Sequence, residues 1–160
     1  MKSETATLAG GCFWGVEELF RKLPGVTDTA VGYTGGTLAK PRYEDVKTGT
    51  TGHAESIQIT FDPDKISYDN ILDYFFRLHD PTTANRQGND RGTQYRSAIF
   101  VHDQAQRDAA KRAIERAQEK WPAKIVTDIV DAADFWPAED YHQDYLQRTP
   151  GGYTCHYLRW

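Results

Sequence analysis

The segment Glu55–Phe61 (ESIQITF) decides the fold, because its apolar and polar residues alternate along the chain. Successive side chains of a β-strand point to opposite faces, so this alternation predicts a strand with one apolar and one polar face. The apolar face carries Glu55, Ile57, Ile59 and Phe61. A strand of this kind belongs in a sheet whose apolar side is covered by helices.

Further strands and helices flank this segment on both sides. Asp62-Pro63 ends the strand, and Ser67 can cap a helix that runs to His79. The other predicted elements are strands at Thr5–Gly10, Val26–Tyr33, Tyr95–Val101 and Ile125–Val130, and helices at Val16–Leu23, Asp103–Lys120 and Trp136–Tyr145. The segments without periodicity are Thr34–His53, Asp80–Gln94 and the tail Thr149–Trp160. This order predicts an α+β fold: a single-domain two-layer sandwich, with helices packed on a mixed, mostly antiparallel sheet and an irregular C-terminal tail.

Composition narrows the class of protein. The 160 residues suit one domain (1–160), and the 20 aromatic residues supply a core that disordered chains lack. No apolar run reaches the ~18 residues that cross a bilayer, so we expect no membrane contact. A net charge of -4 and a pI of about 5.7 argue against a nucleic-acid partner. The first ten residues lack an apolar signal segment, so we expect a cytoplasmic protein. We also expect a monomer.

The two cysteines, Cys12 and Cys155, are too few for a disulfide scaffold or a four-thiolate metal site. Cys12 follows two glycines at the expected start of a helix, where backbone N–H groups and the helix dipole stabilise an anion such as a thiolate. Phe13 and Trp14 lie beside this bend, outside the apolar stripe of the helix, and can wall an apolar pocket. Alternatively, Cys12 is a small buried hydrophobe and the two rings belong to the core.

Glu55 is the polar exception on the apolar face of its strand. Burying an ionised carboxylate is costly, so a buried glutamate tends to keep its proton, and its pKa rises from the usual ~4.3. A carboxyl group in that state can donate a proton near neutral pH. Alternatively, Glu55 lies at the frayed start of the strand and reaches solvent.

Two tyrosines are further candidates for hydrogen-bond donors. Tyr95 has the parity of the inward-facing residues of its predicted strand, and Tyr43 lies in the glycine-rich loop. A tyrosine hydroxyl is a neutral donor that can polarise an oxygen atom. Taken singly, each tyrosine is better explained by ordinary packing.

The segment GGCFWG at Gly10–Gly15 resembles the active-site signature of the A-class peptide methionine sulfoxide reductases. Further segments resemble that family in family order: GYTGG (Gly32–Gly36), YEDV (Tyr43–Val46), TGHAES (Thr51–Ser56), FDP (Phe61–Pro63), HDPTT (His79–Thr83), QGNDRGTQYRSAIF (Gln87–Phe100) and FWPAEDYHQDYL (Phe135–Leu146). The resemblance covers essentially the whole chain, and the combination of GGCFWG, GHAE and GTQYRS is highly specific.

This resemblance implies an enzyme that reduces methionine S-sulfoxide, free or within oxidised proteins, without a metal or a bound cofactor. Cys12 matches the catalytic cysteine, whose thiolate attacks the sulfoxide sulfur and becomes a sulfenic acid. Glu55 matches the residue that protonates the sulfoxide oxygen. The other matched positions are Tyr43 and Tyr95, which share that oxygen, Phe13 and Trp14, which hold the ε-methyl group, and Asp90, His142 and Tyr145, which line the site.

Cys155 lies in a glycine-rich tail, Gly151–His156 (GGYTCH), and the resemblance supports a resolving cysteine in such a tail. It would condense with the sulfenic acid of Cys12, and thioredoxin or another dithiol would reduce the disulfide. We expect residues 149–160 to form a mobile tail. Many family members instead carry GYC and a further cysteine, so the intervening Thr154 implies one resolving step rather than two. A spectator thiol and a structural disulfide are the alternatives.

Two rival functions use other residues. A different cysteine enzyme, such as a peroxidase or a Cys–His hydrolase, would use His53 as its base, but a peroxidase needs an arginine beside the thiolate and none adjoins Cys12. A metal-binding module would use Cys155, His156 and His142, whose spacing is irregular.

Overall fold

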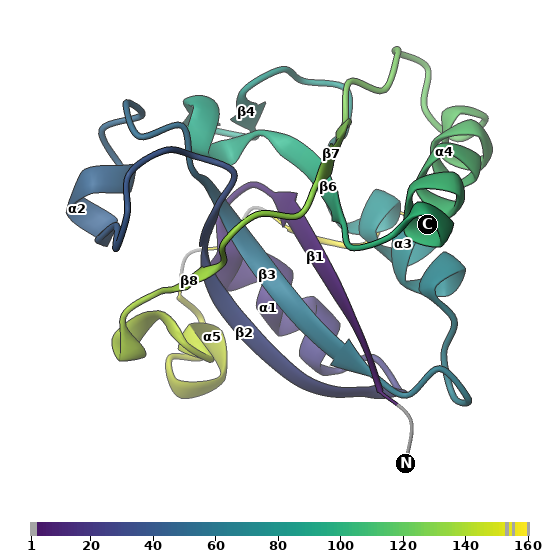
Figure 1. Cartoon of the computed structure of the whole chain (residues 1–160), viewed down its shortest axis with the longest axis horizontal. Coiled ribbons are helices and arrows are strands. Elements are labelled where there is room, and N and C mark those ends of the chain that lie inside the picture. Colours follow the sequence, from purple (N-terminus) through teal and green to yellow (C-terminus); the bar gives the residue numbers. More distant parts are fainter. Residues whose placement is uncertain (1–2, 153, 155, 160) are drawn as a thin grey trace.

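The computed structural model describes residues 3–152, 154 and 156–159, and its centre is a six-stranded sheet (Figure 1). The sheet contains β1 (Glu4–Gly10), β2 (Val26–Thr34), β3 (Ala54–Phe61), β6 (Ser97–Val101), β7 (Asp128–Asp131) and β8 (Trp136–Pro137), in the order β7–β6–β1–β3–β2–β8. Neighbouring strands are antiparallel, except for the parallel pair β6–β7. A separate small hairpin consists of β4 (Arg86–Gln87) and β5 (Asp90–Arg91). The predicted mixed, mostly antiparallel sheet is confirmed.

The strand β3 lies between β1 and β2, as its alternating pattern predicts. Ile57, Ile59 and Phe61 are fully buried, and Glu55 on the same face is 2% exposed. Glu55 pairs with Tyr33 of β2, so it lies inside the ladder rather than at a frayed end. The solvent-exposed alternative for Glu55 is therefore wrong.

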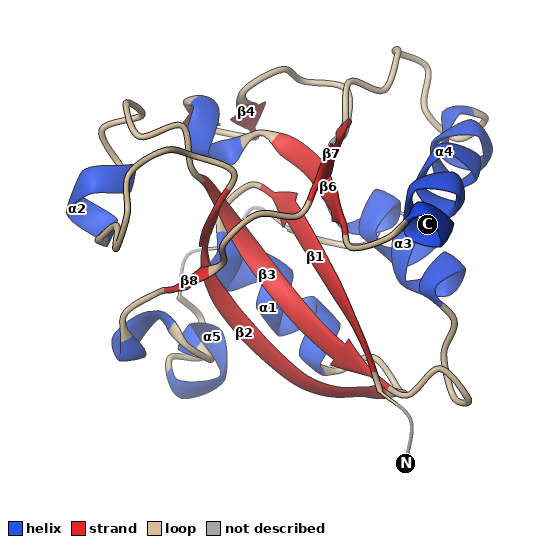
Figure 2. Ribbon diagram, in the orientation of Figure 1, coloured by secondary structure: helices blue, strands red, loops and turns tan. Residues whose placement is uncertain are grey.

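Three longer helices supply the second layer: α1 (Phe13–Arg21), α3 (Tyr68–Leu78) and α4 (Gln104–Gln118). Figure 2 shows α1 behind the long strands β1, β2 and β3, and α3 and α4 together on the side of β6. The predicted caps are present: Ser67 Oγ accepts from the N–H of Asn70 (3.0 Å), and Asp103 Oδ1 accepts from that of Gln106 (2.8 Å). Within the described part of the chain, no helix combines the length and the apolar character that crossing a membrane requires.

The shorter elements are α2 (Tyr43–Val46), η1 (Thr93–Tyr95), η2 (Asp140–His142) and α5 (Tyr145–Arg148). Several element boundaries differ from those predicted from the sequence. Tyr95 ends the 3₁₀ turn η1 instead of opening a strand, because its N–H donates to the carbonyl of Gly92 within that turn. The strand predicted at Ile125–Val130 starts later, at Asp128, since the N–H of Val126 donates to Pro81 instead of to a strand.

The helix predicted at Trp136–Tyr145 is wrong, since this segment contains β8, η2 and only the first residue of α5. Gln143 explains the difference, because its Nε2 donates to the carbonyls of Val31 (2.8 Å) and Ala138 (3.0 Å). Its Oε1 also accepts from the N–H of Val31 (2.9 Å). Contacts with β2 thus replace the hydrogen bonds that a continuous helix would make.

Candidate active site

Cys12 is the N-cap residue of α1, two residues after the end of β1. The preceding Gly11 has a φ of +97°, in the region that favours glycine, and a Cβ atom there would lie 2.6 Å from the side chain of Gln87. The turn therefore requires a residue without a side chain. It places the 7% exposed thiol of Cys12 at the positive end of the helix dipole.

Phe13 and Trp14 are the first two residues of α1, and Phe13 belongs to its buried face, so the prediction that this ring lies outside the apolar stripe is wrong. Both rings nevertheless face the space beside the thiol. Phe13 is 1% exposed and packs with the core cluster, while Trp14 is half-buried. The two alternatives for these rings are therefore not exclusive, because each ring contacts the core and also lines the cavity described below.

Glu55 approaches the same place from β3. Its Oε1 accepts a long hydrogen bond from the backbone N–H of Phe13 (3.4 Å). Burial raises the pKa of Glu55 to about 8; the Phe13 N–H lowers it, and the nearby charge of Asp90 raises it further. The carboxyl group therefore keeps its proton at neutral pH, as the sequence predicts.

One small cavity brings the predicted residues together. Its volume is about 130 Å³, and it is lined by Cys12, Phe13, Trp14, Tyr43, Glu55, Asp90 and Tyr95. A larger depression of about 600 Å³ lies at the N-terminal ends of α3 and α4, but its lining residues include no cysteine. A nucleophile, a neutral acid and aromatic walls therefore meet at the smaller cavity.

Tyr43 and Tyr95 enter the cavity from α2 and η1. Burial, and then the charge of Glu55, raise the pKa of both hydroxyl groups, so both stay protonated and can donate hydrogen bonds. The start of α2 is fixed by Glu139, whose Oε2 accepts from the N–H of Tyr43 (3.0 Å). The Oε1 of Glu139 accepts from the hydroxyl of Tyr33 (2.9 Å).

His142 and Tyr145 lie behind Trp14 and do not line the cavity themselves, so the prediction that they do is corrected. The Nε1–H of Trp14 donates to His142 Nδ1 (3.0 Å), and the rings of Trp14 and Tyr145 stack at 3.9 Å with an interplanar angle of 15°. Because Nδ1 accepts and burial lowers the pKa of His142, that ring is neutral, with its proton on Nε2. The two residues thus fix the orientation of the Trp14 indole.

The C-terminal tail passes close to the turn at Gly10–Cys12, which we call the cysteine turn. His156 is 7% exposed, and its Nε2 donates to the carbonyl of Gly10 (2.6 Å). A Cβ atom on Gly15 would collide with Thr154 Oγ1 and with His156 Nδ1. Thr154 and His156 therefore pack on the first turn of α1. Cys155, the predicted resolving residue, lies outside the described residues.

Those residues of the two rival functions that the structure describes make other contacts. His53 Nδ1 accepts from the N–H of Gly36 (3.1 Å) and its Nε2 donates to the carbonyl of Leu38 (2.7 Å), so this ring holds a loop and does not line the cavity of Cys12. Across residues 3–152, 154 and 156–159, no three His, Cys, Asp or Glu side chains are grouped to bind a metal ion.

Comparison with known proteins identifies the family. A family model described as peptide methionine sulfoxide reductase matches residues 4–159. The chain belongs to the peptide methionine sulfoxide reductase family. It is an oxidoreductase of the A class, which reduces the S epimer of methionine sulfoxide. The resemblance carried by GGCFWG and the segments after it is thus confirmed.

Relatives of known sequence or structure match the whole chain. A peptide methionine sulfoxide reductase MsrA from Mycolicibacterium paratuberculosis is 54% identical over 159 residues, which cover 98% of this chain and 91% of the relative. The reduced form of Mxr1 from Saccharomyces cerevisiae is 43% identical, with a TM-score of 0.95 over 99% of this chain and 93% of that one. The same yeast protein in complex with Trx2 is 32% identical, with a TM-score of 0.69 over 99% of this chain and 91% of that one.

Sequence reasoning missed Glu17 and Glu139, two carboxylates that support the site from outside the cavity. A signal for Glu17 exists, because it lies four residues after Phe13 and three before Phe20 and therefore shares their buried helix face. No comparable signal exists for Glu139, because it lies in an irregular segment and its partners Tyr33 and Tyr43 are distant in the sequence.

Proposed function

We propose that Cys12 is the nucleophile and Glu55 the general acid in the reduction of methionine S-sulfoxide. The single observation that carries this proposal is their shared cavity, in which a thiol at a helix N-terminus faces a carboxyl group that holds its proton at neutral pH. A sulfoxide oxygen is a poor leaving group until it is protonated, so a neutral acid beside the nucleophile supplies what the reaction needs.

The first step transfers the oxygen atom. The Cys12 thiolate attacks the sulfoxide sulfur, and the proton of Glu55 passes to the sulfoxide oxygen. The hydroxyl group then moves from the substrate sulfur to the Cys12 sulfur: its bond to the substrate sulfur breaks and a bond to the Cys12 sulfur forms. The sulfur–sulfur bond made by the attack breaks at the same time, which releases methionine and leaves Cys12 as a sulfenic acid. The cysteine sulfur is oxidised by two electrons and the methionine sulfur is reduced by two, so no further reductant is consumed in this step.

The other lining residues orient the substrate. Phe13 and Trp14 form an apolar slot that suits the ε-methyl group, and the shape of this slot would select one epimer at sulfur. Tyr43 and Tyr95 would donate hydrogen bonds to the sulfoxide oxygen. Asp90 lines the cavity beside Glu55, where its charge favours the protonated acid.

The second step would regenerate the thiolate. Cys155 would attack the sulfenic sulfur of Cys12, release water and form a disulfide, with residues 149–160 moving as a tail of the single domain. Thioredoxin would then reduce the disulfide, a partnership supported by the complex of the yeast relative with Trx2. Such a cycle suits a monomer in the reducing cytoplasm, where it would repair oxidised proteins or free methionine sulfoxide without a bound cofactor.

The experiment measures methionine formation from each sulfoxide epimer separately. Wild-type protein should convert only the S epimer, and Cys12→Ser should abolish the conversion. In Cys155→Ser, one equivalent of methionine should form, and a sulfenic-acid probe should label Cys12. Retained reduction by Cys12→Ser would contradict the nucleophile, and equal probe labelling of Cys12→Ser and Cys155→Ser would contradict the resolving step.

A further inference from the structure

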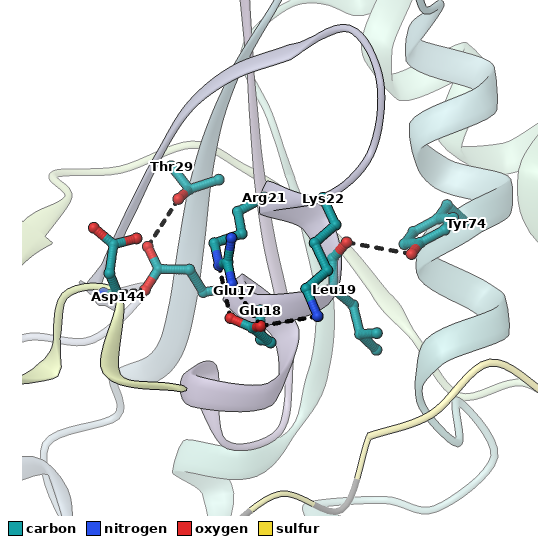
Figure 3. A network of polar contacts seen from close by, with 8 residues as sticks. All are labelled: Glu17, Glu18, Leu19, Arg21, Lys22, Thr29, Tyr74 and Asp144. Atoms are coloured by element: carbon teal, nitrogen blue, oxygen red, sulfur yellow. Dashed lines mark hydrogen bonds and ion pairs between the residues drawn. The ribbon is translucent and has the colours of Figure 1, made fainter. Parts of the chain in front are cut away.

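Glu17 is a buried carboxyl group that no step of the proposed reaction uses. It is 1% exposed and lies on α1 three residues after Trp14, on the same side of the helix. Figure 3 shows its side chain turned toward Thr29 of β2 and toward Asp144. Burying a carboxyl group costs free energy unless it is hydrogen-bonded, so the partners of Glu17 indicate its role.

Both oxygens of this carboxyl group are engaged. The Oε2 of Glu17 accepts from the hydroxyl of Thr29 (2.9 Å), which ties the carboxyl group to the sheet. The Oε1 accepts from the backbone N–H of Asp144 at 2.7 Å. Glu17 therefore joins α1, β2 and the segment between η2 and α5, three parts of the molecule that are distant in sequence.

Asp144 is the residue at which the chain changes direction between η2 and α5. Its backbone is left-handed, with a φ of 53° and a ψ of 35°, which is uncommon for a residue with a side chain. Its side chain makes no capping hydrogen bond with α5. The hydrogen bond from the Asp144 N–H to Glu17 stabilises this turn.

This turn positions two side chains that contact Trp14. His142 lies two residues before Asp144 and accepts the Trp14 indole hydrogen bond (3.0 Å). Tyr145 follows Asp144 directly and stacks on the same indole at 3.9 Å. Trp14 also lines the cavity, so a shift of the turn would reach the cavity through this ring.

We propose that Glu17 is a positioning residue that shapes the substrate slot by holding the turn at Asp144. Without its acceptor oxygens the turn would relax, and the indole of Trp14 would lose its supports. Sulfoxide binding would weaken, while Cys12 and Glu55 would stay in place because other contacts hold them. The inference rests on the proposed role of Trp14 as a wall of the methyl slot.

The test compares Glu17→Leu with Glu17→Gln, and uses Glu18→Gln as the matched control. Leucine removes both acceptors, whereas glutamine keeps an acceptor for the Asp144 N–H and offers an amide to Thr29. Glu18 is the neighbouring acidic residue, and it points away from Glu17 toward Arg21 (2.7 Å) and Lys22 (3.0 Å) (Figure 3).

The first measurement is steady-state reduction of the S epimer at saturating dithiothreitol. KM should rise about tenfold in Glu17→Leu, with kcat within about threefold of wild type, because a binding contact is lost and the reacting groups are kept. Glu17→Gln and Glu18→Gln should both retain the wild-type KM. A merely structural residue would lower the melting temperature without this split between KM and kcat.

The second measurement does not depend on turnover. It follows the ¹H–¹⁵N signal of the Trp14 indole, assigned with Trp14→Phe, which should shift in Glu17→Leu and return in Glu17→Gln. An unchanged indole signal together with an unchanged KM in Glu17→Leu would overturn the proposal. A wild-type protein that reduces no S epimer would instead contradict the proposed function, and the indole signal would still decide the role of Glu17.

If Glu17→Leu does not fold, Thr29→Val decides the question. This substitution removes the hydroxyl that anchors Glu17 and leaves the backbone of β2 intact. Thr27→Val is its matched control, because the Thr27 hydroxyl on the same strand donates to the carbonyl of Thr60 (3.1 Å) and not to Glu17. KM should rise in Thr29→Val and not in Thr27→Val, and equal KM values would overturn the proposal.

Discussion

Glu55 and Glu17 are both buried glutamates on elements that meet at the cysteine turn, and burial raises the pKa of each, to about 8 and about 7. They differ in their partners. Glu55 accepts one long hydrogen bond, at 3.4 Å, and lines a cavity. Glu17 accepts two short ones, at 2.7 and 2.9 Å, and is not among the residues that line this cavity.

This difference shows that a raised pKa by itself does not identify a catalytic acid. A carboxyl group can deliver a proton only where a substrate atom can reach it, which is the condition that Glu55 meets. A carboxyl group whose two oxygens are both occupied by fixed donors serves to hold those donors, as Glu17 does. Burial is common to both carboxyl groups. They differ in whether a substrate can reach them and in how many of their oxygens accept hydrogen bonds from the protein.

The largest effect should come from removing the proton of Glu55. In Glu55→Gln, the rate of methionine formation in a single turnover should fall by about 10²–10⁴-fold, the usual contribution of a general acid. Sulfoxide binding should change much less, because the amide has nearly the same shape. Rapid-quench measurement of methionine tests this, and a rate within twofold of wild type would remove Glu55 as the acid.

The second prediction concerns the free energy of unfolding, which should depend more on Glu17 than on Glu55. Glu17→Leu should lower the free energy of unfolding by about 1–3 kcal/mol, because the Asp144 N–H and the Thr29 hydroxyl lose their acceptor. At pH 5, Glu55→Gln should cost less, since only the long bond from Phe13 is altered. Urea unfolding of both variants checks this ranking, and a larger loss in Glu55→Gln would reverse the comparison.

A smaller effect is expected from the tyrosines beside Glu55. Tyr43→Phe or Tyr95→Phe should each slow the single-turnover reaction about tenfold, the loss of roughly one hydrogen bond to the oxygen in the transition state. The double variant should be slower than either single variant, because the two hydroxyl groups share one oxygen. Unchanged rates in all three would leave Glu55 as the only group that acts on that oxygen.

The pH dependence of stability is a separate test of the raised pKa of Glu55. The pKa of Glu55 is about 8 in the folded protein, against an ordinary value of 4.5, so the folded state holds this proton more tightly than the unfolded state. Its contribution to stability is complete below pH ~4.5 and is lost as the pH rises through about 8. Glu55→Gln should therefore gain stability relative to wild type between these pH values. Unfolding measured at pH 5 and pH 8.5 would contradict this if the difference stayed constant.

Much of this site could be predicted from local patterns. The alternation in β3 placed Glu55 on the buried face, and the glycines before Cys12 indicated the helix start, because both features depend on neighbours in sequence. Element boundaries near Tyr95 and Trp136 could not be predicted in the same way. Their conformations depend on hydrogen bonds with distant residues, such as those between Gln143 and Val31.

The contacts of Glu17 with Thr29 and Asp144 could not be predicted from the sequence for the same reason. Thr29 is 12 positions from Glu17, and Asp144 is 127 positions away, so no window of the sequence contains this cluster. The positions of His142 and Tyr145 behind Trp14, rather than in the cavity, also follow from the left-handed turn at Asp144. Family resemblance indicates which residues gather at the site. The fold shows which of them line the cavity and which contact the lining residues from behind.

The most direct measurement is the pH profile of single-turnover methionine formation for wild type, Glu55→Gln and Glu17→Gln. If Glu55 supplies the proton, the wild-type rate should fall as the pH rises through about 8. The same fall should occur in Glu17→Gln and be absent from Glu55→Gln. A fall that persists in Glu55→Gln, or one that disappears in Glu17→Gln, would contradict the assignment of the acid.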